Sequence, residues 1–551
     1  ISLLEHPLGA QPGQPGDRSA FHFETITRLP STASGLGRDG ARYGRTGIIH
    51  TPHGDIRTPA FVPVGTQAAM KAVLPEQMKD LGAQCLLANA FHLFERPGED
   101  VLDAAGGLAR FMNWDGPTFT DSGGFQVMSL GVGFKKTLAM DVTGMKSDDI
   151  IAKGKERMAW VDEDGVTFKS PLNGDAHRFS AEISMGIQHK IGADIMFAFD
   201  ELTTLMNTRG YQERSVERTY RWAQRCVAEH KRLTEERVGK PYQALYGVVQ
   251  GANYEDLRRH AAEQIASLDF DGVGIGGAIE KRIIGDTCAW ICDAMPESRP
   301  RHVLGIASVD DIFACVENGG DTFDCVAPAR CARNGAIYTR AGRYNIKRAQ
   351  HKFDFGPLEE GCDCYTCQHY SRAYVDHLLR AREFNGFTLA TIHNEHFFVK
   401  LLDDIRASID GGADVEQIFW TNNTVIGELQ TLRDINELNV WLSSMMHRYI
   451  SYVFDLTDIK HVDIIHKATG YIKQHYTSKL TLDEVAKFVY LSKSYLSKIF
   501  KEELHCNFAN YVNNLRVEKS KILLMDQSIN LIDLAAMVGF EDQSYFTKVF
   551  K

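Results

Sequence analysis

The stretch "ADIMFAFDE" (193–201) decides the fold class of this chain. It is a short apolar run that ends in two acidic residues, which predicts a buried strand followed by a polar turn. Seven similar runs follow the same rhythm, each separated from the next by a longer amphipathic stretch. Because eight strands that alternate with helices can close a parallel barrel, we predict an α/β fold of the (β/α)8, or TIM-type, class. The other seven runs are "AFVPVGTQ", "QCLLANAFHL", "PTFTDSGG", "ALYGVVQG", "DGVGIGG", "RHVLGIA" and "DTFDCVAP".

Most of these predicted strands end in polar residues or glycine. Active sites of such barrels lie at the carboxyl ends of the strands, so these residues are candidates for a site. Capping of the following helices would explain one or two of them, but it explains poorly three Asp and a Gln at corresponding positions. The residues are Gln67, Asn89, Asp121, Asp200, Gln250, Gly276, Gly277 and Asp324.

Length and composition set broad limits on the chain. Its 551 residues suggest two to four domains, and its 44% hydrophobic content is ordinary for a globular protein. No run of about 18 apolar residues occurs, so we predict no membrane span. The net charge of −10 argues against wholesale coating of nucleic acid but not against a local basic site. We expect residues 1–20 to be a disordered leader, because they lack the charge and apolar pattern of a signal peptide.

Composition changes near residue 413. The chain before this point is rich in Gly and Arg, whereas the chain after it is rich in Lys, Asn, Ile and Ser and nearly free of Arg. We therefore predict a first domain over 21–412, a helical connector over 413–458 and an all-α domain over 459–551.

Three cysteines lie within six positions in "CDCYTC", as Cys362, Cys364 and Cys367. The eleven cysteines of the chain are odd in number and scattered, which favours the cytoplasm and a metal over a secreted disulfide framework. Clustered thiolates repel one another unless a cation holds them, and structural zinc takes four ligands. "LATIHNEHFF" offers His393 and His396 as the fourth, and spacing alone favours neither.

Several motifs together resemble the bacterial-type tRNA-guanine transglycosylases, also called queuine tRNA-ribosyltransferases. They are "TDSGGFQVMSL" (120–130), "MFAFDE" (196–201), "YGVVQG" (246–251), "GIGG" (274–277), "TFDCVAPARCARNG" (322–335) and the cysteine motif. The resemblance covers roughly 21–412, with a zinc subdomain at about 355–412. It implies a cytoplasmic homodimer that replaces the wobble guanine of tRNAs with GUN anticodons by a 7-deazaguanine. It also implies one structural Zn²⁺, with His393 as the fourth ligand.

The resemblance implies a role for each matching residue. Base exchange with retention needs two carboxylates, as in retaining glycoside hydrolysis, and the matching positions are Asp324 as nucleophile and Asp121 as general acid and base. The positions that match residues around the base are Asp200 and Gln250 at the purine edge, Gly277 with backbone groups at close range and Phe125 stacked on the base. The positions that match contacts to the anticodon loop of the tRNA are Arg330 and Arg333.

Two segments depart from the family pattern. "AIEKR" follows "IGG" in the loop that lies over the incoming base, which leaves open whether the substrate is the queuosine precursor or queuine. Residues 132–164 form a longer connection than a plain hairpin, and we interpret them as an insertion.

The last segment resembles the AraC/XylS-type DNA-binding domain, with two helix-turn-helix units carried by "SKSYLSKIFKEE" and "GFEDQSYFTKVFK". Because the chain stops at "TKVFK", where that family continues, we expect an incomplete last helix and weak DNA binding. The residues implied to contact DNA are Lys493, Ser494, Ser497 and Lys498 in the first unit, and Asp542, Gln543, Ser544 and Lys548 in the second.

Two other interpretations stay open. The chain could be a transcription regulator that uses the barrel as a deazapurine sensor, or an artificial fusion of two unrelated genes. The sensor interpretation predicts loss of the catalytic carboxylates. Asp121 and Asp324 are both present, which favours an enzyme.

Overall fold

The structure is a computed structural model that describes residues 16–29, 43–125, 158–205 and 207–411, and most of 468–550. Within the last range the description omits 470, 473–474, 479, 490, 494–495, 498–499, 502–506, 524–530 and 541. The chain divides into two compact units, Ile1–Gly427 and Glu428–Lys551. The predicted connector over 413–458 and most of the predicted insertion, up to 157, lie outside the described residues.

The first unit contains an eight-stranded parallel sheet, in the order β4-β14-β13-β12-β11-β10-β6-β5. A parallel bridge between Val64 and Leu87 joins the two end strands, so the sheet closes into a barrel. All eight strands lie within the eight predicted runs, which confirms the TIM-type fold. Their bounds are β4 Ala60–Pro63, β5 Leu86–Asn89, β6 Thr118–Asp121, β10 Ile195–Phe197, β11 Ala244–Val249, β12 Gly272–Ile275, β13 Arg301–Val303 and β14 Thr322–Cys325.

The strands are apolar throughout because both faces of the barrel wall are covered. In β10, Ile195 and Phe197 belong to the cluster that fills the barrel interior, whereas Met196 between them belongs to the larger cluster outside. Alternate residues of a strand point to opposite faces, so one short run serves both clusters. This is why the strands read as continuous apolar runs.

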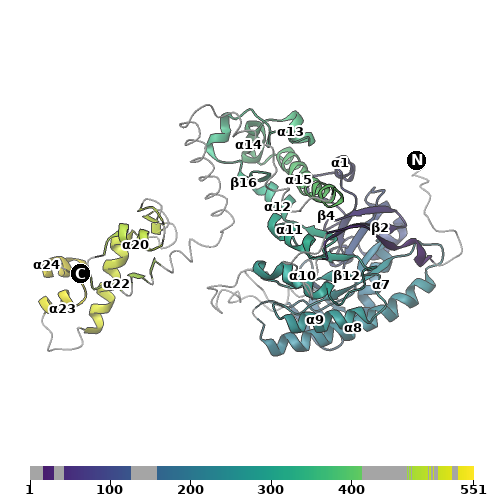
Figure 1. Ribbon diagram of the computed structural model, residues 1–551, viewed down its shortest axis with the longest axis horizontal. Coiled ribbons are helices and arrows are strands. Elements are labelled where there is room, and N and C mark those ends of the chain that lie inside the picture. The colour runs from purple at the N-terminus through teal and green to yellow at the C-terminus, as the bar shows by residue number, and fades with distance from the viewer. Residues whose placement is uncertain are drawn as a thin grey trace. The chain divides into compact units, whose positions relative to one another are not determined.

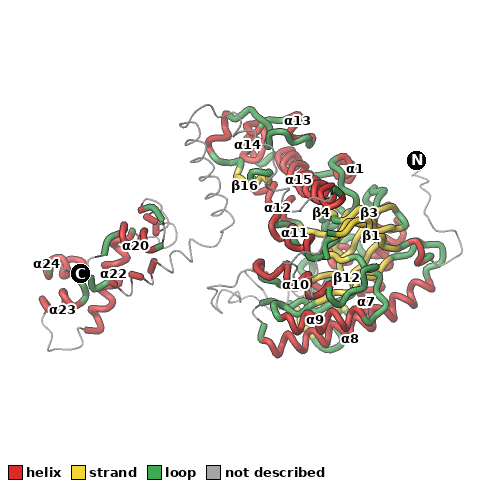
Figure 2. The backbone as a smooth tube through the Cα atoms, in the orientation of Figure 1, coloured by secondary structure: helices red, strands yellow, loops and turns green. Residues whose placement is uncertain are grey.

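Helices cover the outer face of the barrel, as Figure 2 shows in red around the yellow strands. Neighbouring helices along the chain pack side by side, from α7 against α8 to α10 against α11. Their bounds are α1 Pro75–Asp80, α2 Ala90–Glu95, α3 Glu99–Ala105, α4 Leu108–Phe111, α7 Ala181–Ile191, α8 Arg209–Glu236, α9 Glu255–Ala266, η3 Lys281–Ile283, α10 Ile284–Cys292, α11 Val309–Glu317 and α12 Ala327–Asn334.

Two small antiparallel sheets accompany the barrel. The first comprises β1 (His22–Arg28), β2 (Arg45–Thr51) and β3 (Gly54–Thr58), and its Ile49 and Ile56 belong to the same cluster as the barrel interior. The second comprises β7 (Ala159–Val161), β8 (Val166–Lys169) and β9 (Ala176–Phe179), so β7 uses the last residues of the predicted insertion.

Regular structure begins within the predicted leader. Arg18–Ala20 form a short 3-10 helix, η1, and Arg18 pairs with Asp269 at 2.8 Å and with Asp271 at 2.8 Å. Residues 1–15 lie outside the described residues. The ion pairs of Arg18 therefore place the end of the leader segment against the barrel.

A subdomain with its own small core follows β14. It contains β15 (Ala336–Thr339), β16 (Gly342–Asn345), η4 (Ala349–Phe353), α13 (Tyr365–His369), α14 (Arg372–Ala381) and α15 (Phe384–Asp410). Figure 1 shows α13, α14 and the first part of α15 grouped at one end of this unit. The long helix α15 also returns to the barrel wall, where Phe398 stacks on Phe61 of β4 with ring centroids 5.0 Å apart.

The second unit is all-helical in its described residues, as predicted. Its helices are α20 (Leu482–Phe488), α22 (Phe508–Leu523), α23 (Leu531–Met537) and α24 (Gln543–Phe550). Thr481 and Glu484 form a capping box at the start of α20. Gly539 has φ +93°, a conformation that glycine adopts easily, and it forms the tight turn between α23 and α24. None of the helices in the described ranges combines the length and apolar composition that a membrane-spanning segment requires.

Candidate active site and metal centre

Asp121 and Asp324 lie at the carboxyl-terminal mouth of the barrel. Asp121 is the last residue of β6, and Asp324 is the penultimate residue of β14. Both side chains are half-buried. The strand order places β6 and β14 three strands apart around the closed ring, so the two carboxylates face the mouth from different sides.

Asp121 is held by donors from the neighbouring strand end and from its own turn. Its Oδ1 accepts the Ala90 N–H at 3.0 Å and the Gly123 N–H at 3.3 Å, and the Asn89 amide donates to Oδ2. Burial raises the pKa of Asp121 to about 7, and the nearby charge of Asp324 adds to this rise while the three donors oppose it. Asp121 can therefore both give and take a proton near neutral pH.

Asp324 receives two contacts on a single oxygen. Its Oδ1 accepts the Gly305 N–H at 2.9 Å and lies 3.1 Å from Nε2 of His302. The side chain is 14% exposed, so the carboxylate reaches the mouth while its polar contacts come from β13 and the turn after it. These two contacts fix the orientation of the Asp324 carboxylate.

Asp200 and Gln250 form a buried pair after β10 and β11. The Gln250 amide donates to Oδ2 of Asp200 at 2.6 Å, and the Ser122 hydroxyl donates to Oδ1 at 3.2 Å. Burial raises the pKa of Asp200 to about 6. Oε1 of Gln250 is buried, and no described residue gives it a hydrogen bond. Oε1 of Gln250 is therefore free to accept a hydrogen bond from a base, and the Asp200 carboxylate can accept one if the base displaces the amide of Gln250.

Gly277 lies against this pair. It has φ +93°, and a Cβ added there would come 2.5 Å from Oε1 of Gln250 and 3.2 Å from Nη2 of Arg258. Arg258 is fully buried and ties the loop together by donating to the carbonyls of Val249 at 2.9 Å and Gly276 at 2.7 Å. A side chain at this position would therefore force a neighbouring side chain to shift, and the positive φ adds backbone strain for any residue but glycine.

The other residues implied to bind substrate lie close to these positions in the chain. Phe125 is 39% exposed and is the last described residue of the loop after β6. Arg330 and Arg333 both lie on α12, which starts directly after β14. Arg330 is exposed, whereas Arg333 is half-buried with one terminal nitrogen that has no hydrogen-bond partner in the described chain.

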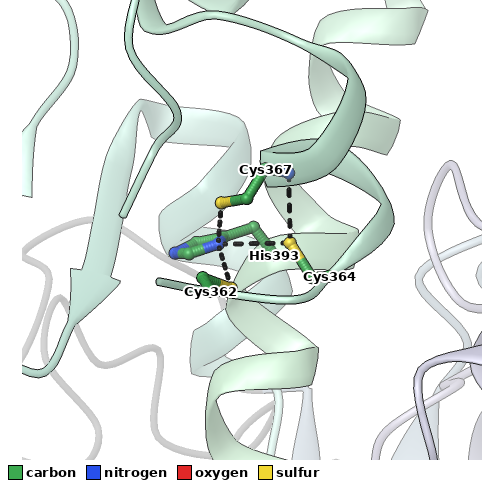
Figure 3. Close-up of side chains that lie close together, drawn as sticks. All are labelled: Cys362, Cys364, Cys367 and His393. Carbon is green, nitrogen blue, oxygen red and sulfur yellow. Dashed lines mark hydrogen bonds between the residues drawn. The ribbon is translucent and has the colours of Figure 1, made fainter. Parts of the chain in front are cut away.

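The three cysteines and one histidine come together between α13 and α15 (Figure 3). Nδ1 of His393 lies 3.7 Å from the sulfur of Cys362, 3.5 Å from that of Cys364 and 3.3 Å from that of Cys367. A tetrahedral Zn²⁺ with ordinary Zn–S and Zn–N bonds separates such ligand atoms by roughly 3.5 Å. The four residues can therefore hold a metal ion of this kind.

The orientation of His393 fits a ligand. Its Nε2–H donates to the Tyr338 carbonyl at 2.8 Å, which leaves Nδ1 free of its proton and directed at the sulfurs. His396, the alternative from spacing, lies one helical turn further on and pairs with Asp363 at 2.8 Å instead. Cys362 also lies near that pair, but His393 is the histidine that faces all three cysteines.

In the second unit, the residues implied to contact DNA are only partly described. Lys493, Ser544, Lys548 and Asp542 are exposed, and Ser497 and Gln543 are half-buried, whereas Ser494 and Lys498 lie outside the described residues. Asp542 precedes α24 and accepts the Ser544 N–H at 2.8 Å. Its carboxylate is thus engaged in capping the helix.

Sequence reasoning missed two buried residues of the site. Arg258 lies on α9 and His302 in the middle of β13, and both are 0% exposed. His302 offered a signal, because it is a polar residue within an apolar run and such a group is buried only with partners. Arg258 offered none, because it lies among the charged residues of α9. The residues that contact Arg258 and His302 include some that are distant in the sequence, so a local sequence pattern could not identify them.

Comparison with known proteins agrees with this geometry. Residues 39–418 match the family model described as queuine tRNA-ribosyltransferase. The queuine tRNA-ribosyltransferase of Lysinibacillus sphaericus is 44% identical over 368 residues, which cover 66% of this chain and 88% of the relative. That of Symbiobacterium thermophilum is 43% identical over 400 residues, covering 72% and 90%, and that of Staphylococcus epidermidis is 44% identical over 368 residues, covering 66% and 89%.

These matches place the TIM-type barrel, with its two carboxylates at the mouth and its Cys3His cluster, in a class of transferases. The chain belongs to the queuine tRNA-ribosyltransferase family. Residues 485–551 separately match a helix-turn-helix domain model, so the expected combination of the two domains is confirmed.

Proposed function

We propose that this chain exchanges the wobble guanine of tRNAs with GUN anticodons for a 7-deazaguanine, through a covalent link between ribose and Asp324. The observation that carries the proposal is the placement of Asp121 and Asp324 at one barrel mouth, with the pKa of Asp121 raised to about 7. The relatives' names specify a tRNA and queuine, and the family membership supports the same reaction type here.

The first half of the reaction removes guanine. The Asp324 carboxylate forms a bond to C1′ of the ribose as the bond from C1′ to N9 breaks, and the electron pair leaves with the base. Protonated Asp121 gives its proton to the base, which departs as neutral guanine. The target nucleotide must leave its stack to reach the pocket, as in other enzymes that modify bases.

The second half installs the new base. The deprotonated Asp121 takes the proton from N9 of the incoming base, and N9 then attacks C1′. The bond from C1′ to Asp324 breaks, and its electron pair returns to the carboxylate. Asp121 ends protonated and Asp324 ends free, so the enzyme is restored.

Asp200 and Gln250 recognise the base in this scheme. A carboxylate accepts from the paired N–H donors of a guanine-like ring, and Gln250 offers both an acceptor and a donor. Gly277 lets the backbone approach the ring, and Phe125 stacks on it. "AIEKR" replaces the family pattern beyond Gly277, and comparing the incorporation of the precursor with that of queuine identifies the incoming base.

One structural Zn²⁺ bound by Cys362, Cys364, Cys367 and His393 completes the proposal. Bound zinc supplies folding energy to the subdomain and takes no part in the exchange. Arg330 and Arg333 hold the anticodon loop through phosphates and neighbouring bases. We further propose a homodimer in the cytoplasm, where its tRNA substrates are.

A second candidate function is DNA binding by the last segment. The helix-turn-helix match and the exposed Lys493, Ser544 and Lys548 favour it. A regulator that senses a deazapurine through the barrel would bind the base without exchanging it. Salt-sensitive binding of the full chain to DNA, without turnover of tRNA, would support that candidate.

Incorporation of labelled guanine into a tRNA with a wobble G tests the proposal. Wild-type protein incorporates label, and Asp324→Ala incorporates none, because no covalent intermediate forms. Asp55→Ala, which removes an exposed carboxylate from β3, is the matched control and behaves as wild type. Failure of folded wild-type protein to incorporate guanine would refute the proposed exchange.

A further inference from the structure

His302 lies deep in the barrel and reaches the Asp324 carboxylate. In the pairing of β13 with β14, His302 is opposite Thr322, and Asp324 is two residues further along the same face of β14. Nε2 of His302 lies 3.1 Å from Oδ1 of Asp324, and Nδ1 lies 2.9 Å from Oγ1 of Thr322. One imidazole therefore spans the two side chains.

The surroundings of the ring fix its orientation. His302 is 0% exposed, and its ring packs against Phe119 and Phe197, with centroids 5.5 and 5.1 Å away. A neutral imidazole has one donor and one acceptor nitrogen. Because the Asp324 carboxylate only accepts, the proton of the neutral ring lies on Nε2 and is donated to Asp324, and Nδ1 accepts from the Thr322 hydroxyl.

The second donor to this carboxylate comes from the backbone. The Gly305 N–H donates to the same Oδ1 at 2.9 Å, so two donors converge on one oxygen. Both hydrogen bonds that described residues make to the Asp324 carboxylate are thus to Oδ1. Oδ2 is thereby left for a ligand at the barrel mouth.

We propose that His302 is a positioning residue that, with the Gly305 N–H, holds Oδ1 of Asp324 so that Oδ2 is the atom that attacks the ribose. This inference rests on the proposed base exchange. In the first half-reaction the bond forms between Oδ2 and C1′ while Oδ1 becomes the carbonyl oxygen of the ester. In the second half the electron pair of that bond returns to the carboxylate, whose regained charge on Oδ1 is stabilised by the same two donors.

Three variants separate positioning from packing. His302→Leu keeps an apolar side chain among the phenylalanines but removes both ring contacts. His302→Gln restores a donor at the position of Nε2 and so serves as the conservative variant. Thr322→Val keeps the shape of Thr322 while removing the hydroxyl that fixes the ring. Thermal unfolding of each variant checks the fold.

The measurement is the single-turnover rate at which the protein forms a covalent complex with a tRNA that carries guanine at the wobble position, with the tRNA dissociation constant measured alongside. We expect His302→Leu to slow this rate by about 10- to 100-fold, the effect of one hydrogen bond to a charged group, with tRNA affinity unchanged. His302→Gln recovers most of the rate, and Thr322→Val is slowed to a smaller extent than His302→Leu.

The outcomes distinguish this inference from the function on which it rests. If wild-type protein neither forms the complex nor exchanges guanine, the proposed function fails. If wild-type protein does both and His302→Leu reacts as fast, the inference alone is refuted. Equal loss in His302→Gln and His302→Leu would also refute it, because the role would then be packing. Should His302→Leu not fold, an unchanged rate in Thr322→Val would refute the inference in its place.

Discussion

Replacing Gly277 by alanine tests the proposed base pocket at its tightest point. The new Cβ would come 2.5 Å from Oε1 of Gln250, a separation that carbon and oxygen do not tolerate without a shift. Arg258 on the other side is buried and bound to two backbone carbonyls, so it cannot move away easily. Gln250 is therefore the side chain that must give way.

We expect Gly277→Ala to be unfavourable in free energy for two reasons. Alanine at φ +93° is strained by about 1–2 kcal/mol relative to glycine. Displacing Gln250 breaks its 2.6 Å hydrogen bond to the Asp200 carboxylate, and a bond to a charged group contributes about 1.5–3 kcal/mol. The first part lowers the free energy of unfolding. The second moves Gln250 away from the proposed position of the base, so guanine should bind at least about 10-fold more weakly.

Guanine affinity measured by calorimetry, together with urea unfolding, checks both parts. Gly186→Ala is the matched control, because Gly186 lies inside α7 and an added Cβ meets nothing within 4 Å. Alanine there should raise the free energy of unfolding by about 0.5–1 kcal/mol and leave guanine binding unchanged. Wild-type guanine affinity in Gly277→Ala would show that Gly277 and Gln250 do not form the base pocket.

Three further predictions concern the carboxylate, the metal and the tRNA. With the pKa of Asp121 at about 7, guanine release needs the protonated acid and should slow as pH rises above 7. Attack by the incoming base needs the carboxylate and should slow as pH falls below 7. The rates of the two half-reactions can be measured by rapid mixing, and a single shared pH profile would contradict the role of Asp121 as acid and base. Cys364→Ser should lose the zinc, measured by elemental analysis. It should also lower the melting temperature of the first unit, because binding of the metal contributes to the free energy of folding there. A wild-type protein that folds normally without zinc would exclude the metal. Arg330→Ala should weaken tRNA binding while guanine affinity stays unchanged. The slope of log tRNA affinity against log salt concentration should fall in magnitude by roughly 0.7–0.9, the contribution of one phosphate contact. An unaltered slope would show that Arg330 does not contact the tRNA backbone.

The barrel could be predicted from sequence because its strands are buried on both faces. A run such as that around Phe197 is short, apolar and bounded by polar residues. Eight such runs that alternate with longer amphipathic stretches favour a parallel barrel over other fold classes. The strand-end residues Asp121, Asp200 and Asp324 could be located for the same reason, since the end of a buried run is visible in the sequence. The cysteine spacing likewise pointed to three of the four residues that the structure brings together in the Cys3His cluster.

Features that depend on contacts between distant segments, or on strands without an apolar run, could not be predicted. His302 contacts Asp324 only because β13 pairs with β14 in one particular register, which no local pattern encodes. The choice between His393 and His396 depends on which side of α15 faces α13, and spacing alone left it open. The three-stranded sheet β1–β3 was missed because polar and charged residues interrupt each of its strands, so none of them contains an apolar run like those of the barrel.

The helix α15 restricts how this chain can change in evolution. Consecutive residues of this helix contact different parts of the protein. Nδ1 of His393 faces the cysteines, and the Asn394 amide donates to the carbonyls of Pro328 at 3.1 Å and Ala336 at 3.0 Å. One turn further on, Phe398 packs against the barrel wall. A single inserted residue between these positions would rotate one part of the helix by about 100° relative to the other. The segment from His393 to Phe398 therefore cannot gain or lose a residue without separating the Cys3His cluster, the arginine-bearing helix α12 and the barrel.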